Sequence, residues 1–294
     1  MSLCKRFLIV SNLKKLKEFV SSLQDQNGGI AASLGGESDP NNGFLIKHLL
    51  ELGMKNVALG FRDYLLDCQN ADGGWGMNGK EPSMISLTAN ALRGLCDVGV
   101  SPKDIAIKRA VKFLFAYQQK ESGFSETVDI GVPWMKPGVV WGWITATVVE
   151  ALYSAGIRIT TPAFDDAALF VRKRFWENRE GIEGQSVMIR ALRNTCFAVK
   201  IETKEMKRRI DCETQAENGG FPKENPNLDT TLNVLAFLYD IGIRDNDVRF
   251  GKAVDFTVSS RNKDGGWPAT PGEKSVLWAS LESAVLLKNL KRLQ

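Results

Sequence analysis

The chain has 294 residues, of which 44% are apolar and 24% charged, an ordinary composition for a globular protein with a large core. Its formal net charge is only +4 and no concentrated Lys/Arg stripe occurs, so the sequence indicates no nucleic-acid partner. The five cysteines are dispersed and form no CxxC pair; they indicate neither a disulfide framework nor a cysteine zinc site, and reduced thiols fit best.

The N-terminal apolar run is too short for a signal peptide, and no stretch approaches the ~20 apolar residues that cross a bilayer. We therefore expect a cytoplasmic protein. Peripheral contact with a membrane stays open, and nothing in the sequence indicates an oligomeric state.

Six loops along the chain share one pattern, in which the sixth residue is a glycine. The loops read QDQNGGI, QNADGGW, QQKESGF, WENREGI, QAENGGF and RNKDGGW, and the shared glycines are Gly29, Gly74, Gly123, Gly181, Gly220 and Gly266. Successive glycines are 45, 49, 58, 39 and 46 residues apart, and four loops begin with Gln. This register indicates an internal repeat of about one helical hairpin per unit.

In chain order, an amphipathic helix precedes each loop and a nearly all-apolar helix follows it. Residues 104–118 are of the first kind, with Lys and Arg between apolar residues at helical spacing. Residues 142–156 and 230–242 are of the second kind, and a helix that is apolar on all sides is buried on all sides. Glycines followed by an apolar residue end the apolar helices, as is typical of left-handed helix termini.

This alternation predicts twelve helices over residues 11–290, with one helix of each pair outside and one inside. The sixth apolar helix has no polar capping face, which favours a closed ring over an open solenoid. We therefore expect an all-α (α/α)6 toroid, with residues 1–294 as a single domain. All inner helices would begin at the same mouth, where exposed N–H donors and variable loops favour a functional site.

The Q-x3-GGW loops resemble the QW repeats of squalene–hopene cyclase and oxidosqualene cyclase, and the hairpin ring resembles the β subunit of protein prenyltransferases. The resemblance covers nearly the whole chain. It implies that Gln69 and Trp75, and their counterparts in the other loops, brace neighbouring outer helices.

The resemblance also implies a candidate proton donor. Class II terpene cyclases carry a DxDD motif followed by Thr, and the best match is Asn227-Leu228-Asp229-Thr230-Thr231 at the start of the fifth inner helix. Asp229 falls on the proton-donating position, while Asn227 replaces the first Asp and Thr230 the last. Burial would keep the acid protonated, and Asn227 and Thr230 would orient it. A second interpretation stays open, in which Asp229 is an ordinary helix N-cap.

A carbocation intermediate also needs aromatic walls, because ring faces stabilise nearby cations. Trp134, Trp141 and Trp143 cluster before the third inner helix, and Trp278 opens the sixth. We expect these side chains, with Ser86, to line the mouth and to bind substrate; ordinary packing is the alternative.

The resemblance to prenyltransferase β subunits would imply a zinc site of Asp, Cys and His. The single histidine, His48, lies in an apolar segment, and Asp211-Cys212 lies on an outer helix, so we expect no metal. No DDxxD motif for diphosphate ionisation occurs either.

These features favour a class II terpene cyclase, an isomerase or lyase that cyclises a linear isoprenoid after protonation by Asp229. The reaction needs no cofactor, although Mg²⁺ would accompany a substrate that carries a diphosphate. Two alternatives remain. One is a non-catalytic ring that binds a ligand or a protein. The other is an enzyme similar to polysaccharide lyases, because the segment Gly265–Pro268 resembles the GGWP-like loops of such enzymes.

Overall fold

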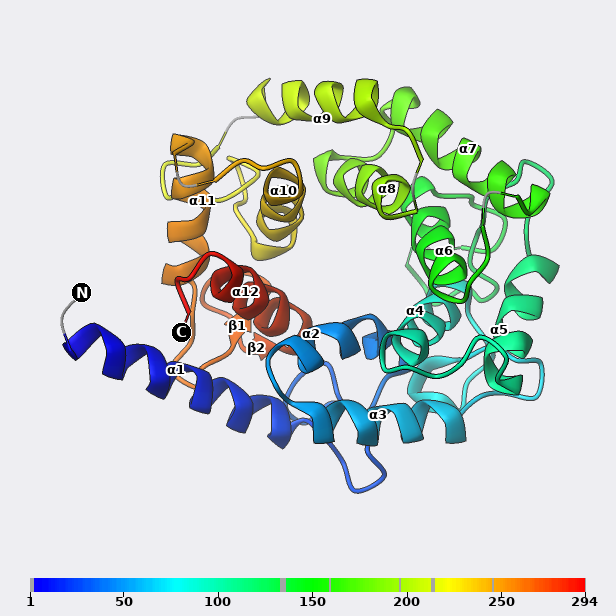
Figure 1. The fold of residues 1–294 in the computed structure, drawn as a ribbon, viewed down its shortest axis with the longest axis horizontal. Coiled ribbons are helices and arrows are strands. Elements are labelled where there is room, and N and C mark those ends of the chain that lie inside the picture. The colour runs from blue at the N-terminus through cyan, green and yellow to red at the C-terminus, as the bar shows by residue number, and fades with distance from the viewer. Residues whose placement is uncertain are drawn as a thin grey trace.

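The helices form one closed ring with an outer and an inner layer (Figure 1). This computed structural model describes residues 3–132, 136–158, 160–195, 197–212, 215–244 and 246–293, with side chains from residue 13 onward. The outer ring consists of α1 (Leu3–Ser22), α3 (Lys55–Asp67), α5 (Ile105–Ala116), α7 (Pro162–Glu177), α9 (Lys200–Cys212) and α11 (Val248–Ser259). The inner ring consists of α2 (Ile46–Glu51), α4 (Ile85–Asp97), α6 (Gly142–Ser154), α8 (Ile182–Asn194), α10 (Leu228–Asp240) and α12 (Leu277–Asn289).

The predicted (α/α)6 toroid is therefore confirmed, with twelve α-helices in the described part of the chain. Two short 3₁₀ helices accompany them, η1 (Pro40–Leu45) and η2 (Met77–Gly79). The sixth loop adds a small antiparallel pair, β1 (Trp267–Pro268) and β2 (Ser275–Val276). The first inner α-helix is short, because the preceding segment, which begins PNNG, disfavours α-helix and forms 3₁₀ turns.

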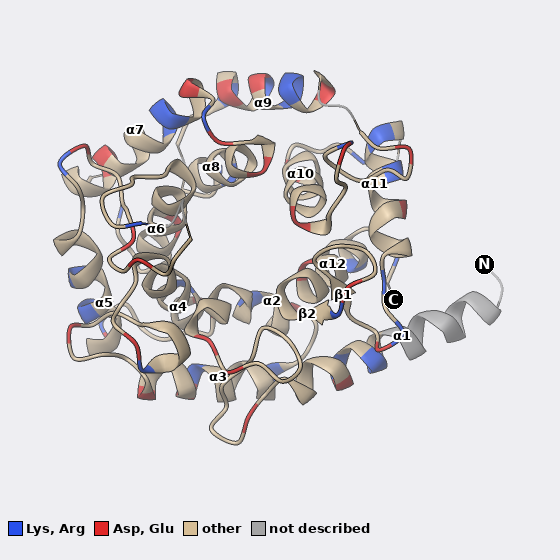
Figure 2. Ribbon diagram, turned by 180° about the vertical axis from the view of Figure 1, so that it is seen from behind, with Lys and Arg blue, Asp and Glu red and all other residues tan. Residues whose placement is uncertain are grey.

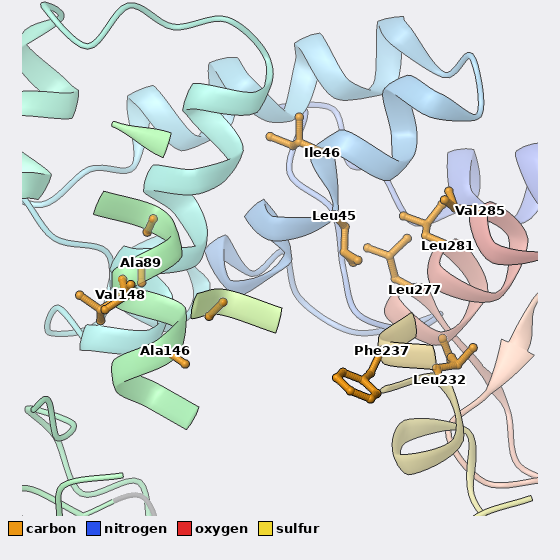
Figure 3. Packing of buried hydrophobic residues seen from close by; sticks show 14 of the residues in the cluster. Leu45, Ile46, Ala89, Ala146, Val148, Leu232, Phe237, Leu277, Leu281 and Val285 are labelled. Carbon is orange, nitrogen blue, oxygen red and sulfur yellow. The ribbon is translucent and has the colours of Figure 1, made fainter. Parts of the chain in front are cut away.

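Burial follows the alternation that the sequence shows. Outer helices such as α7 and α9 carry alternating basic and acidic residues on their exposed sides (Figure 2). The inner helices α4, α6, α10 and α12 bury most of their residues, and Ala89, Ala146 and Val148 pack between α4 and α6 (Figure 3).

The ring is closed by contacts between its first and last units. Leu45 of η1 lies beside Leu277 and Leu281 of α12 (Figure 3). The Leu277 N–H donates to the carbonyl of Ala32 at 2.8 Å, and Lys288 donates to the carbonyl of Glu51.

The Gln at the head of a loop joins that loop to the next outer helix. Gln69 Nε2 donates to the carbonyls of Gly73 and Ala106, both at 2.9 Å. Gln24, Gln118 and Gln215 make the equivalent pair of bonds. The loop indoles are also tied down, since Trp75 Nε1 donates to Leu65 O at 2.7 Å. Together these bonds fix the spacing of the hairpins and hence the width of the ring.

Candidate active site

The second residue of each long inner helix marks the mouth of the ring. Because the hairpins repeat, equivalent helix positions occupy equivalent places around the ring. The residues at this position are Ser86, Trp143, Glu183, Asp229 and Trp278. Four of them were predicted site residues, and the fifth, Glu183, was not predicted.

Glu183 and Asp229 form a pair of carboxyl groups between α8 and α10. Their side chains lie within hydrogen-bonding reach, and this contact raises the pKa of Glu183 and lowers that of Asp229. Burial, and then the negative charge of Asp229, raise the pKa of Glu183 to about 7. Burial also raises the pKa of Asp229, while the hydrogen bond from Glu183 opposes that rise. The two groups therefore titrate as one unit that retains a proton close to neutral pH.

The other residues of the NLDTT segment have separate roles. Asn227 is the N-cap of α10, because its side-chain oxygen accepts from the Thr230 N–H at 2.9 Å. The Thr230 hydroxyl donates to Glu183 Oε2 at 3.4 Å, so it contacts the acid pair through the partner of Asp229. Thr231 accepts from the Phe221 N–H at 2.9 Å and thereby fixes the fifth loop.

The interpretation of Asp229 as the helix N-cap is therefore wrong. Asp229 lies in the first turn, past the cap, and its carboxylate accepts a hydrogen bond of 3.3 Å from Asn233 of the same helix. Asn227 does the capping and does not touch Asp229 through any hydrogen bond among the described residues.

Asn227 offers a clean test of this division of roles. Asn227→Ala removes the acceptor for the Thr230 N–H, and we expect it to lower the free energy of unfolding by about 1 kcal/mol. Asn227→Asp keeps an acceptor at the same place and should leave stability within about 0.5 kcal/mol of the wild type. Urea unfolding of the three proteins provides the measurement, and equal midpoints for Asn227→Ala and the wild type would contradict the cap assignment.

A pocket of about 440 Å³ opens beside the pair, between the starts of α6 and α8. Trp141 and Trp143 line it together with Glu183, so two of the predicted aromatic residues do lie next to the acid. Ser86 and Trp278 share the helix position but belong to neither this pocket nor the pair. Trp134 lies outside the described residues.

The N–H groups at the starts of several inner helices are already bonded. The Glu126 carboxylate accepts from Ile85 N and Ser86 N at 2.9 and 3.1 Å. Glu180 accepts in the same way from the first two N–H groups of α6, and the carbonyl of Ala269 accepts from the first N–H of α10. The expectation of exposed N–H donors is therefore wrong for these helices, because each neighbouring loop supplies a cap.

Below the mouth, a channel of about 290 Å³ runs between the inner helices. Val187 lines both this channel and the mouth pocket, so the two spaces lie along one face of α8. Toward the far end, ion pairs join neighbouring helices: Arg93 contacts Glu150 at 2.8 Å, and Arg190 contacts Asp240 at 3.2 Å. The channel thus has apolar side chains near the mouth and a charged floor.

The residues considered for zinc do not converge. His48 lines the channel, where burial lowers its pKa to about 3 and keeps the imidazole neutral. Cys212 is exposed at the end of the outer helix α9. Among the described side chains, no group of three or more His, Cys, Asp or Glu residues has the arrangement of a metal site. Within the same residues, no helix combines the length and the apolar character required to cross a bilayer.

The chain resembles known proteins in part of its sequence and in its whole fold. Residues 1–131 match the family model of the prenyltransferase alpha-alpha toroid domain. No curated protein sequence matches the chain. Among solved structures, it resembles a variant of the type II terpene cyclase MstE from Scytonema in complex with geranylgeranyl dihydroxybenzoate. The TM-score is 0.72 at 13% identity, with 100% of both chains covered.

Sugar-cleaving enzymes share the same ring. An α-amylase from Clostridium perfringens has a TM-score of 0.66 at 13% identity, with 95% of this chain and 97% of that chain covered. A glycosidase has a TM-score of 0.67 at 10% identity, with 100% of both chains covered. At such identities these similarities concern the fold alone. The chain therefore has the α/α toroid fold that its QW-like loops indicated, and its first 131 residues match the prenyltransferase alpha-alpha toroid domain.

Proposed function

We propose that this protein is a class II terpene cyclase that starts the cyclisation of a linear prenyl substrate by protonating it. The acid is the carboxyl pair of Asp229 and Glu183, rather than Asp229 alone. The observation that carries the proposal is this buried pair, which retains a proton near neutral pH at the mouth of the ring.

An alkene is a very weak base, so its protonation requires an acid that is kept neutral and shielded from water. Burial and the Asp229 charge keep the proton on Glu183, and the hydrogen bond leaves Asp229 ready to take part in its transfer. When the pair gives up its proton, the negative charge left behind stabilises the nearby carbocation. Trp141 and Trp143 supply ring faces on the Glu183 side of the same pocket.

The substrate would be a hydrophobic isoprenoid whose terminal alkene reaches the pair. The MstE structure, which has the same fold, holds a geranylgeranyl aromatic acid. A chain lying along the channel would pass Val187 and Leu232 and place its polar end near the charged floor. The proton comes from the protein, so this reaction needs no cofactor.

The test is to incubate the purified protein in D₂O with geranylgeranyl diphosphate, a geranylgeranylated hydroxybenzoate and squalene. We expect a cyclic isomer of one substrate, with one deuterium on the carbon that was protonated. Mass spectrometry of the products measures this. Absence of any isomeric product from all three substrates would overturn the proposal.

A second candidate is a sugar-cleaving enzyme, because the channel floor is charged and two carboxyl groups are the usual catalytic set for glycosidic bonds. The fold likeness to an α-amylase and a glycosidase is compatible with it. Release of reducing ends from starch or pectin, without cyclisation of any prenyl substrate, would favour this candidate. A ring that only binds ligands would give neither product.

A further inference from the structure

Glu282 is a carboxyl group of the channel that the proposed protonation step does not use. It is the sixth residue of α12 and lines the channel opposite Val187 and beside Leu232. Among the described residues it forms no hydrogen bond and no ion pair. Two other acidic side chains of the channel wall differ, since Glu150 is bonded to Arg93 and Asp240 to Arg190, whereas Glu51 is exposed at the end of α2. Glu282 is thus a half-buried carboxyl that is open to whatever fills the channel.

Burial and the surrounding charges set the pKa of Glu282 close to neutral pH, so both of its protonation states are accessible. Burial raises its pKa to about 7; Arg190 and Arg93 favour the ionised form, while Asp229 favours the protonated form. The charged and titratable groups of the inner helices around it are Lys47, His48 and Glu51 of α2, Arg93 of α4, Glu150 of α6, Arg190 of α8, and Asp229 and Asp240 of α10. His48 is neutral, so the two arginines are the main groups that stabilise the Glu282 carboxylate.

Glu282 also lies deeper in the channel than the acid pair. Asp229 is the second residue of α10 and Glu282 the sixth of α12, and these two helices are in contact. Four residues of helix correspond to a rise of about 6 Å, so Glu282 lies one helical turn below the mouth. Leu232 and Val187 are the fifth residue of α10 and the sixth of α8, so they supply apolar side chains to the channel wall at this depth.

We propose that Glu282 is the proton acceptor that ends the cyclisation, an inference that rests on the proposed function. The Glu183–Asp229 pair transfers its proton to the terminal alkene, and the remaining double bonds close the rings and move the cation along the substrate. The Glu282 carboxylate then removes a proton from the carbon next to the final cation, and the electrons of that C–H bond form the alkene of the product. The protein has moved one proton from the pair to Glu282, and exchange with water restores both groups.

The electrostatic link between the two sites favours this order of events. Before the reaction, the pair carries a single negative charge. After protonating the substrate it carries two, and negative charge near Glu282 raises the proton affinity of this carboxylate. The first proton transfer therefore makes Glu282 a better base for the last one.

The experiment compares the products of the wild type, Glu282→Gln and Glu282→Asp from geranylgeranyl diphosphate in D₂O. In Glu282→Gln the acid pair remains, so protonation and ring closure continue, but the cation lacks its base. We expect water to capture it, with at least a tenfold rise in the ratio of hydroxylated product to alkene. Glu282→Asp should restore part of the alkene. Glu273→Gln, an exposed carboxyl-to-amide change in the sixth loop, is the matched control and should behave like the wild type.

The product ratio should also depend on pH. In the wild type the alkene fraction should fall below pH 7, where Glu282 becomes protonated, whereas in Glu282→Gln the ratio should be independent of pH. An unchanged ratio and an unchanged pH profile in both variants would overturn the role of Glu282 while leaving the cyclase proposal intact. A wild-type protein that forms no isomer at all would overturn both.

Discussion

Asp229→Asn and Glu183→Gln should each abolish cyclisation, lowering kcat by about 100- to 10,000-fold. Each change removes one carboxyl of the pair, and the remaining one loses the neighbour that holds the shared proton near neutral pH. The measurement is product formation under saturating substrate. Because the two groups act as one acid, Asp229→Asn combined with Glu183→Gln should be little worse than either single change.

The stability of the Glu183→Gln variant provides a control for folding, because we expect this change to lower kcat but to raise stability above pH 7. The pKa of Glu183 is about 7 in the folded protein and near 4.5 in the unfolded chain, so the folded state binds the proton more tightly. Its contribution to stability is therefore present at low pH and is lost as pH rises toward 7. Glu183→Gln carries no such charge, so relative to the wild type it should gain stability above pH 7. Asp255→Asn and Glu217→Gln, both exposed, are the matched changes that should affect neither rate nor stability.

Wild-type activity should show the same titration. The acid form of the pair is lost as pH rises through about 7, and kcat should fall there. Undiminished product formation by both Asp229→Asn and Glu183→Gln would remove the acid role from this site.

The architecture could be predicted from the sequence because each repeat shows its loop and the burial of its helices in its own residues. Six glycines in register mark the loops, and the alternation of amphipathic and apolar helices separates the outer ring from the inner one.

The site was predicted only in part, because the motif search considered one helix at a time. Asp229 lies in NLDTT, but its partner Glu183 belongs to the neighbouring helix α8, which has no recognisable motif. A comparison of the second residue of each inner helix would have aligned Glu183 with Asp229. Glu282 follows no motif at all, since its properties arise from burial and from arginines on two other helices.

The roles of Asn227 and Thr230 could not be predicted from the motif either. Both are polar residues next to the acid in sequence, yet Asn227 is bonded to the backbone of α10 and Thr230 contacts Glu183. Helix geometry explains this, because adjacent residues point in directions about 100° apart and cannot all face the channel.

Trp267→Ala should give the largest loss of stability, about 3–5 kcal/mol in the free energy of unfolding. Trp267 is only 1% exposed, and its Nε1 donates to Thr257 O of α11 at 2.7 Å. Its backbone N–H donates to Ser280 of α12 at 2.8 Å, so the residue joins the last hairpin where the ring closes. Since domains are stable by only about 5–15 kcal/mol, this change should remove a large share of the total.

The measurement is urea unfolding followed by circular dichroism, with Trp267→Phe and Trp176→Ala as controls. Trp267→Phe keeps most of the buried ring but leaves Thr257 O without its donor, so a loss of about 1–3 kcal/mol is expected. Trp176 is 46% exposed on α7, and its truncation should cost no more than about 1 kcal/mol. If Trp267→Ala cost as little as Trp176→Ala, the bonds of Trp267 to α11 and α12 would contribute little to the stability of the last hairpin.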